Sequence, residues 1–408
     1  MPTLSDHGGR LGEPIRSRAV TGRGFAGLYF GIDAHGAERE GEGNSTYTRG
    51  LISALLAAGG SDRFALFAAN PDHLFYRSLP ARGRSRAIRV AQGRGLARLG
   101  WALARAASRE AVDGLHVQYI APVGYRGPLV VTVHDLGFLA VPESFPLALR
   151  LALKVLVPRS LARASRVIAV SEFVRRDIVA RYAIPPEKIV VIPEGADARF
   201  HPRPTSQIVP VLARYGLEPG FLFSLGRLNR RKNLERLLLA YARTRLASSA
   251  PLVVGGKPDY GVSELLRATL SGDASGVRFV GLIPDEDLPA FYSGAAAFVY
   301  PSLFEGFGLP VLEAMACGTP VVTSDRTALP ELTADAALAV DPESVEALAE
   351  AMTRILTDKE RAEDLRWRGL ERSRLFSWGE MARGTLEVYH AALGTGAPTA
   401  KGGGRGSG

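Results

Sequence analysis

Short segments rich in apolar residues alternate with longer, helix-like segments along most of the 408-residue chain. In the first half they occur at 27–33, 64–69, 115–120, 129–135, 166–171 and 189–195. After a polar stretch at 196–207 the pattern starts again, at 221–226, 251–256, 277–282, 296–302 and 319–324. Strands that are apolar along their whole length are typical of parallel sheets covered on both faces. The alternation therefore predicts an α/β chain with two doubly wound domains that leave a cleft between them.

The order of these segments also predicts where the chain divides and where a ligand binds. Helices are expected between the strands, at 46–59, 172–182, 233–245, 286–295, 310–317 and 380–394. The expected divisions are a disordered leader at 1–24, a first domain at 25–200, a second domain at 201–375, a C-terminal helix at 376–394 and a disordered tail at 395–408. Ligands of open parallel sheets bind beyond the carboxyl ends of the strands. The loops after Asp33, Val133, Gly226 and Ser302 are therefore expected to form the site.

Charge and cysteine content narrow the classes of partner and compartment. The net charge of +9 and the pI near 9.8 suit an anionic partner such as a nucleotide or a lipid head group. Only six of the 50 basic residues are Lys, so a general preference for Arg explains the charge equally well. We expect no nucleic-acid partner, because few aromatic residues lie among the basic ones. The single cysteine, Cys317, excludes an internal disulfide and fits a cytoplasmic protein.

Two carboxylates flank a flexible turn in the stretch 305-EGFGLPVLEAMACGTPVV-322. Pro310 suits the first turn of a helix, so Glu305 is expected on the preceding loop and Glu313 within the helix. Gly308 allows a ligand to approach the backbone, and the free amides of a helix start attract an anion. Carboxylates beside that anion accept hydrogen bonds from hydroxyls, which together describe a nucleotide-sugar. The alternative is a plain turn with Glu313 complementing the helix dipole.

Four cations follow the strand at 221–226, within the stretch 224-SLGRLNRRKNLERLL-238. Clustered cations repel one another unless an anion joins them, and Arg and Lys are the usual partners of phosphate. We assign a phosphate-binding role to Arg227, directly after the strand, and to Lys232, directly before the helix. For Arg230 and Arg231 we favour a solvated basic turn.

The first domain offers a histidine and a short glycine loop at strand ends. His134, in 131-VTVHD-135, can donate to a substrate oxygen or move a proton. The alternative is a structural histidine bonded to the backbone, which we favour for His116. Gly43 and Asn44 lie on a loop before the helix at 46–59, where their backbone can contact a ligand. No GxGxxG follows the first strand and no P-loop motif occurs, so neither a dinucleotide fold of that type nor a P-loop NTPase is supported.

Together these segments resemble the retaining glycosyltransferases of family four (glycosyl transferases group 1, mannosyltransferase-like), which have the two-Rossmann-domain fold called GT-B. The resemblance covers about 27–393 and rests on segments that match in order: 43–51, 131–135, 168–178, 191–197, 225–238, 277–322 and 376–378. The family's two-acid element, a Glu followed by seven residues and a second Glu, is met by Glu305 and Glu313.

The resemblance implies roles for the predicted site residues. Arg227 and Lys232, beside Gly226, would hold the donor's diphosphate and stabilise the charge of the leaving group. Glu313 would bind the ribose hydroxyls, and Glu305 would contact the hydroxyls of the transferred sugar.

Further roles are implied for backbone amides and for the first domain, which would receive the acceptor. The amides of Phe307, Gly308 and Leu309 would meet the phosphate or the sugar. Gly43 would close on the diphosphate, His134 would face the sugar, and the final helix would cross back onto the first domain.

The implied reaction is metal-independent transfer of a mannose-like or glucose-like hexose from a GDP-sugar or UDP-sugar, with no further cofactor. The acceptor would be a glycan or a lipid-linked sugar in the synthesis of cell-surface polysaccharide or glycolipid. Retention fits a front-face reaction, and a double displacement through Glu305 is the rival. The alternatives are a same-fold epimerase or phosphorylase, and a non-catalytic nucleotide-sugar-binding protein.

Two stretches of the first domain, 81–109 and 146–166, mix Arg with apolar residues at roughly helical spacing. We favour ordinary surface helices that pack their apolar side inward. The alternative is basic amphipathic helices that place a cytoplasmic enzyme on the inner face of an anionic membrane.

Overall fold

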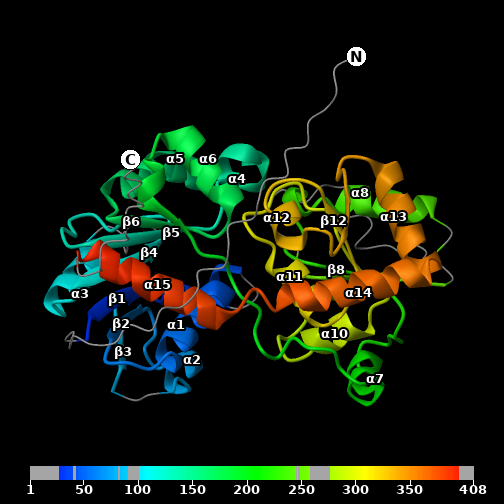
Figure 1. Ribbon diagram of the computed structural model, residues 1–408, viewed down its shortest axis with the longest axis horizontal. Helices are drawn as coiled ribbons and strands as arrows, with labels where there is room; N and C mark the ends of the chain where they lie inside the picture. Colours follow the sequence, from blue (N-terminus) through cyan, green and yellow to red (C-terminus); the bar gives the residue numbers. More distant parts are fainter. Residues whose placement is uncertain are drawn as a thin grey trace, which may run out of the picture.

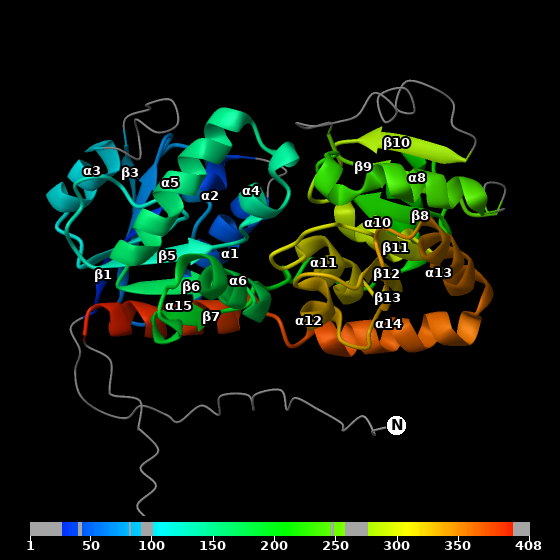
Figure 2. The same cartoon turned by 90° about the horizontal axis from the view of Figure 1, so that it is seen from above.

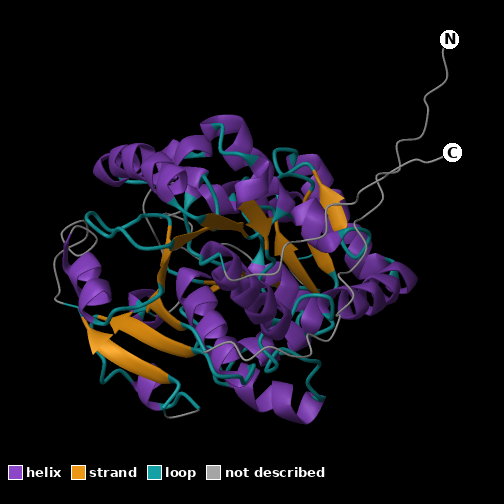
Figure 3. Ribbon diagram, turned by 60° about the vertical axis from the view of Figure 1, so that its left-hand side comes forward, coloured by secondary structure: helices purple, strands orange, loops and turns teal. Residues whose placement is uncertain are grey.

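The computed structural model describes residues 27–39, 43–80, 83–90, 101–244, 246, 249–257 and 276–394. Figure 1 shows two lobes side by side, the first coloured blue to green and the second green to orange. Each lobe is a parallel sheet with helices on both faces, as the orange strands between purple helices show (Figure 3). The predicted class of two doubly wound α/β domains is confirmed. The expected leader and tail lie outside the described residues.

The first sheet has the strand order β3-β2-β1-β4-β5-β6-β7, and every neighbouring pair is parallel. Its strands are β1 (Tyr29–Asp33), β2 (Arg63–Ala68), β3 (Ser85–Arg89), β4 (Gly114–Gln118), β5 (Leu129–Val133), β6 (Arg166–Ala169) and β7 (Ile189–Val191). β5 is buried at all five positions, as expected for a central strand covered on both faces.

The second sheet repeats this winding in the order β10-β9-β8-β11-β12-β13. Its strands are β8 (Leu222–Leu225), β9 (Leu252–Gly255), β10 (Val277–Gly281), β11 (Ala297–Tyr300), β12 (Val321–Ser324) and β13 (Leu338–Val340). In this sheet the chain leaves β8 in one direction for β9 and returns to its other side at β11. The loops after β8 and β11 therefore diverge and leave a crevice at the carboxyl ends of these strands.

The helices agree with the predicted alternation, with differences at their ends. The first domain contains α1 (Gly43–Ala57), α2 (Leu74–Arg77), α3 (Leu103–Arg109), α4 (Gly137–Ala140), α5 (Leu147–Arg163) and α6 (Glu172–Tyr182). The second contains α7 (Thr205–Ala213), α8 (Leu234–Arg243), α10 (Leu288–Gly294), α11 (Leu309–Ala316), α12 (Leu329–Thr333), α13 (Val345–Thr357) and α14 (Lys359–Ser373). α15 (Trp378–Ala392) ends the described chain.

The helical interpretation of 81–109 is wrong over Ser85–Arg89, which is β3. This segment pairs with β2 from Phe64↔Ser85 onward, and at this edge its arginines reach solvent while Ile88 packs on the core. Residues 91–100 lie outside the described residues. The helix expected at 146–166 is present as α5.

α15 runs back across the first domain, as the red helix beneath the blue and green lobe shows (Figure 2). It packs mainly against α1, and the Tyr389 ring stacks on Phe30 with centroids 3.8 Å apart. The Tyr389 hydroxyl lies 2.7 Å from Nδ1 of His116, whose Nε2 lies 2.7 Å from the Thr132 hydroxyl. Because burial lowers the pKa of His116 to about 3, this histidine is a neutral structural group, as predicted.

Candidate active site

One cavity of roughly 1270 Å³ lies between the two domains. Its walls include the ends of β5, β8 and β11 and the first turns of α1 and α11. The ten residues proposed from the sequence for catalysis or donor binding all line it: Gly43, His134, Gly226, Arg227, Lys232, Glu305, Phe307, Gly308, Leu309 and Glu313. The fold thus brings together positions up to 270 residues apart, and their individual roles stay predictions.

The loop after β11 and the start of α11 are shaped by glycine and proline. Gly308 is the N-cap of α11 with φ 114°, a left-handed conformation that suits glycine, and Pro310 lies in the first turn. Phe307 and Leu309 flank this cap and line the cavity with it, and a helix start leaves backbone amides without partners inside the helix. Gly318, at the other end, has φ 72° and ends the helix.

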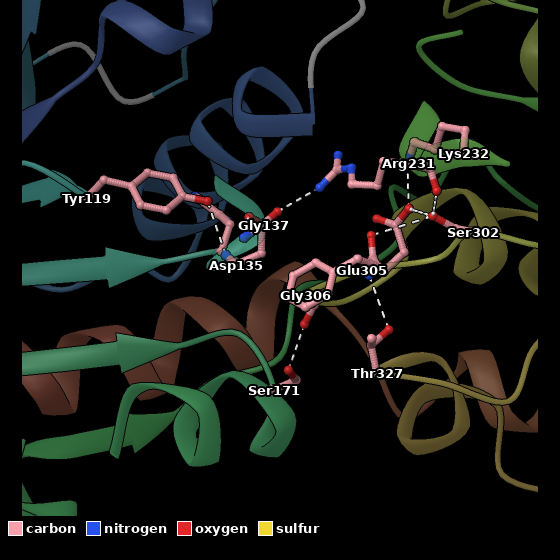
Figure 4. A network of polar contacts seen from close by, with 12 residues as sticks. Tyr119, Asp135, Gly137, Ser171, Arg231, Lys232, Ser302, Glu305, Gly306 and Thr327 are labelled. Atoms are coloured by element: carbon pink, nitrogen blue, oxygen red, sulfur yellow. Dashed lines mark hydrogen bonds and ion pairs between the residues drawn. The ribbon is translucent and has the colours of Figure 1, made fainter. Parts of the chain in front are cut away.

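Lys232 and Glu305 form a buried ion pair in the second-domain wall of the cavity (Figure 4). The Lys232 ammonium lies 2.6 Å from Oε1 of Glu305 and also donates to the Tyr300 hydroxyl. Ser302 donates to the same carboxylate oxygen at 2.5 Å, and Tyr300 lies 3.1 Å from it. The Glu305 amide donates to the Thr327 hydroxyl at 3.1 Å. The carboxylate is therefore held through one oxygen.

The charge state of this pair follows from burial and from its neighbours. Burial alone would raise the pKa of Glu305, but Lys232 and Arg231 lower that pKa to about 2. Burial lowers the pKa of Lys232 from its usual 10.5, while Glu305 opposes the change. Because Glu305 keeps its negative charge throughout the neutral range, it acts as a hydrogen-bond acceptor and a weakly basic carboxylate.

Arg231 was expected in a solvated turn, and the structure contradicts that expectation. Its guanidinium crosses the cleft and donates to Oδ2 of Asp135 at 2.9 Å, with both side chains less than one-fifth exposed. Burial would lower the pKa of Arg231, but Glu305 and Asp135 raise it. The Arg231 carbonyl of the 3-10 turn Arg230–Lys232 is bonded by Ser302 and Leu303, just after β11, and local sequence does not reveal this contact. Arg230 is largely exposed, as expected.

Glu313 lies on the buried face of α11, where its Oε2 accepts a hydrogen bond from the Tyr292 hydroxyl at 2.8 Å. Burial raises the pKa of Glu313 to about 8, although the Tyr292 contact lowers it in part. Asp285 and Arg199 line the same cavity, where Asp285 raises the pKa of Glu313 and Arg199 lowers it. A carboxyl at this depth is poised to gain hydroxyl partners, since hydrogen bonds to the carboxylate favour its charged form.

Replacing Glu313 with Gln is expected to change how stability depends on pH. A carboxyl whose folded pKa is raised stabilises the fold below its unfolded pKa, near 4.5, and that contribution is lost as pH rises through about 8. The melting temperature of Glu313→Gln relative to wild type should therefore rise by about 5 °C or more between pH 5 and pH 8.5. Thermal unfolding of both proteins across this range measures the difference. A constant gap would contradict a raised pKa at this position.

Gly226 and Arg227 lie at the carboxyl end of β8. Gly226 has φ 156°, and a Cβ atom there would lie 3.3 Å from Cε of Lys232. Gly256, at the end of β9, packs so closely that a Cβ atom would overlap the Gly226 carbonyl. Because neither glycine carries a side chain, the β8 loop and the aliphatic part of Lys232 both fit in the crevice. Arg227 is exposed on the cavity wall beside them.

His134 is held from both sides at the end of β5. Its Nδ1 lies 3.0 Å from Oε1 of Glu194, and its Nε2 lies 2.9 Å from Oε1 of Gln118. The Gln118 amide donates in turn to the Thr48 hydroxyl at 2.7 Å, and the Tyr47 ring meets the imidazole edge-on. The ring therefore has a defined orientation, and His134 lines the cavity.

Gly43 is the first residue of α1 and not part of a preceding loop, so the helix begins three residues earlier than predicted. Both Gly43 and Asn44 are exposed and line the cavity, and a Cβ atom on Gly43 would meet nothing within 4 Å. The amide of Gly43 is thus a helix-start donor on the first-domain side.

The sequence carries an Asp-x-Asp at 285–287, contrary to the expectation that none is present, and the structure separates its two carboxylates. Asp285 lines the cavity, whereas Asp287 is buried and accepts hydrogen bonds from Arg214 and from the Tyr215 hydroxyl. Within the described ranges no cluster of three or more His, Cys, Asp or Glu side chains could hold a metal ion.

Sequence reasoning missed four polar residues that support the site. Glu194 and Gln118 orient His134, Tyr300 contacts the Lys232–Glu305 pair, and Tyr292 contacts Glu313. Glu194 stands within the segment 191-VIPEGAD-197, where a lone Glu after an apolar strand was the available signal. The other three lie inside predicted strands or helices, where the sequence does not distinguish a polar side chain of the site from one that only supports the fold.

The chain belongs to glycosyltransferase family 4. Residues 42–200 match the family described as Glycosyltransferase Family 4, and residues 214–372 match the one described as Glycosyl transferases group 1. The two matches divide the chain where one sheet ends and the next begins. The predicted family is confirmed.

Individual relatives and solved structures agree with this placement. The chain is 35% identical to the O-antigen chain mannosyltransferase B of Escherichia coli over 264 residues, which are 64% of this chain and 69% of that protein. Among solved structures it is similar to sucrose-phosphate synthase from Thermosynechococcus elongatus, with a TM-score of 0.70, 26% identity and coverage of 90% and 99%. HepE from Anabaena in complex with UDP-glucose matches with a TM-score of 0.68 and 20% identity, over 89% and 99% of the two chains, and shares the fold. The GT-B fold class is confirmed.

Proposed function

We propose that this glycosyltransferase moves a mannose-like or glucose-like hexose from a nucleotide-diphosphate sugar to a glycan or lipid-linked acceptor, with retention and without a metal ion. The products would serve cell-surface polysaccharide or glycolipid synthesis. A mannosyl donor is supported by the 35% identity to a protein named as an O-antigen mannosyltransferase. A GDP-sugar and a UDP-sugar are both retained as donors, since a protein of the same fold was solved with UDP-glucose.

The cations of the β8 loop support a role in binding the diphosphate. Arg227 and Lys232 line the cavity after a strand end, and the residues at the start of α11 line the same cavity. Preorganised cations and amides stabilise the negative charge that develops on a leaving diphosphate. In this proposal Arg227 and Lys232 supply the charge that a metal ion supplies in other enzymes.

The two carboxylates support recognition of hydroxyls on either side of the diphosphate. Glu305 stays ionised beside Lys232, so its second oxygen can accept hydrogen bonds from the transferred sugar. Glu313 would accept the two ribose hydroxyls. The backbone between them, from Phe307 to Leu309, would face the phosphates and the sugar, as the family resemblance implies.

The reaction we propose is a front-face displacement. The bond between the sugar C1 and the diphosphate oxygen breaks, and its electron pair stays on that oxygen. The acceptor hydroxyl oxygen bonds C1 on the same face, and its proton passes to the leaving diphosphate. Glu305 is a weak nucleophile here, because its charge is stabilised by Lys232 and one oxygen is held by Ser302. A glycosyl adduct trapped on Glu305 would support double displacement instead.

The observation that carries this proposal is the buried Lys232–Glu305 pair, at 2.6 Å, in the wall of the cavity between the domains. A panel of GDP-sugars and UDP-sugars tests it by thermal stabilisation of the protein. A matching donor at 100 times its Kd should add about 2.7 kcal/mol to the free energy of unfolding. Transfer to acceptor glycans with EDTA present should then proceed. Activity that requires added metal, stabilisation by no donor, or release of free or phosphorylated sugar as the product would contradict it.

We propose that α5 contacts an anionic membrane or the lipid of the acceptor. The helix contains Arg and Lys but no Asp or Glu. Four of its apolar side chains are about half exposed: Leu147, Leu149, Leu151 and Val155. The expected inward packing holds for Val157 and Leu161 in the second half of the helix. No described helix combines the length and apolarity needed to cross a bilayer. A basic helix with exposed leucines can instead lie in the interface.

Vesicle flotation of the whole protein tests the membrane contact. Binding is expected to phosphatidylglycerol vesicles at low salt and to fall with salt or with neutral phosphatidylcholine. The variant Leu147→Glu/Leu151→Glu should bind at least about tenfold more weakly, because it removes apolar contacts and adds like charge to the vesicle. Leu239→Glu, at an exposed position on α8, is the matched control. Equal binding by both variants, or none by wild type, would leave α5 an ordinary surface helix.

A further inference from the structure

We propose that Arg231 and Asp135 form an interdomain ion pair that holds the two domains in the catalytic arrangement and sets the spacing between His134 and the Lys232–Glu305 pair. The proposal rests on the transferase function proposed above. Both residues are positioning residues, since each acts through its neighbour in the chain.

Each partner is covalently adjacent to a site residue of its own domain. Asp135 follows His134 at the end of β5, and Arg231 precedes Lys232 in the β8 loop. The 2.9 Å contact between the Arg231 guanidinium and Asp135 Oδ2 spans the cleft between them, as Figure 4 shows. A bond between the neighbours of two site residues limits how far those residues can separate.

Asp135 is fixed so that one oxygen is left for the other domain. Its Oδ1 accepts a hydrogen bond from the Gly137 amide at 2.8 Å, and its own amide donates to the Tyr119 hydroxyl at 3.1 Å. Tyr119 has φ 59°, a conformation uncommon for a residue with a side chain, and its partly buried ring packs against the hydrophobic core. Oδ2 is thereby presented across the cleft to Arg231.

Arg231 is tied equally firmly to the loop that carries Glu305. Its carbonyl accepts a hydrogen bond from the Leu303 amide at 2.8 Å. The Ser302 hydroxyl lies 3.1 Å from the same carbonyl and 2.5 Å from Oε1 of Glu305. A movement of the Arg231 turn must therefore move the Glu305 loop with it.

A second ion pair between the domains, Arg230–Glu143, is much more exposed to solvent than Arg231–Asp135. Arg230 and Glu143 also join the two domains, at 3.6 Å, but their side chains are 65% and 41% exposed. The Arg231 and Asp135 side chains are 19% and 18% exposed. An exposed pair contributes little, whereas removing one partner of a buried pair leaves an uncompensated charge at the junction. Arg230 and Glu143 therefore provide a matched control.

Activity assays on Arg231→Gln, Asp135→Asn and the double variant test the pairing. Each single variant should lower kcat by about 10- to 100-fold, because a displacement of about 1 Å costs that much, with the donor KM changed less than about threefold. The double variant should be no slower than the slower single variant, since both changes remove one interaction. Arg230→Gln and Glu143→Gln should leave kcat within about twofold. If the losses in kcat of the two single variants multiplied in the double variant, or if only the donor KM rose, the residues would contact the ligands directly. Either result would contradict the proposed role of the ion pair.

A distance measurement tests the same pair without turnover. Dyes are attached to cysteines introduced as Arg77→Cys on α2 and Glu286→Cys just before α10, two exposed positions, one in each domain. The native Cys317 is buried and stays unlabelled, so the dyes report only the distance between the domains. GDP or UDP should bring the dyes closer in the wild type and in Arg230→Gln. Arg231→Gln should leave them in the longer-distance distribution, and closure as in wild type would overturn the proposal. Normal closure of the wild type with no transfer from any donor would instead count against the proposed function.

Discussion

Changing Lys232 to Met is expected to lower kcat by about 10³-fold, because it removes a cation aimed at the developing charge of the leaving diphosphate. Changing Glu305 to Gln should lower it by about 10²-fold or more, through lost contacts to the sugar and a loosened Lys232. Each single change also leaves one charge buried without its partner, which costs about 3–5 kcal/mol of stability. Steady-state kinetics with the stabilising donor and denaturant unfolding measure the two effects.

The double variant Lys232→Met/Glu305→Gln separates the effect of the ion pair on stability from its effect on catalysis. With both charges gone, much of the lost stability should return, because no uncompensated charge remains. The activity should stay at or below that of the single variants. If the double variant recovered activity together with stability, the pair would serve the fold alone. Normal turnover in both single variants would refute the proposed function.

A single methyl group at Gly306 should reduce transfer by more than about 100-fold. A Cβ atom there would overlap the carbonyl oxygen of His134, so Gly306→Ala pushes apart the two loops that carry the candidate catalytic groups. The same change strains the 2.6 Å hydrogen bond from the Ser171 hydroxyl to the Gly306 carbonyl. Because each domain keeps its own core, the loss should fall on kcat with little change in the circular dichroism spectrum.

Gly379→Ala is the matched control for this substitution. A Cβ atom at Gly379, near the start of α15, would lie no closer than 3.8 Å to a neighbour, so kcat should stay within about twofold of wild type. Full activity in Gly306→Ala would mean that the two loops do not need to touch during the reaction. Aggregation of this variant would be followed by testing donor binding to the soluble fraction.

Most of the architecture could be predicted from short-range patterns. Apolar strands such as β5 and β12 are buried on both faces, and their composition shows it directly. β3 was missed, because an edge strand needs few apolar residues and its arginines resemble a basic helix. The start of α1 was predicted three residues late, because glycine disfavours helices and Gly43 is the first residue of α1.

The sequence by itself determined the fold class and the family, and it predicted ten site residues that all line the cavity. The strand ends, the proline in a first turn and the two acids eight positions apart are patterns within about ten residues, and the family follows from the order of such segments along 27–393. Only the tertiary structure decided which of those residues are held and by what. The contact of Arg231 with Asp135 joins positions 96 apart, and that of Gly306 with Ser171 joins positions 135 apart. Both depend on how one domain sits against the other, and no local pattern of residues encodes that orientation.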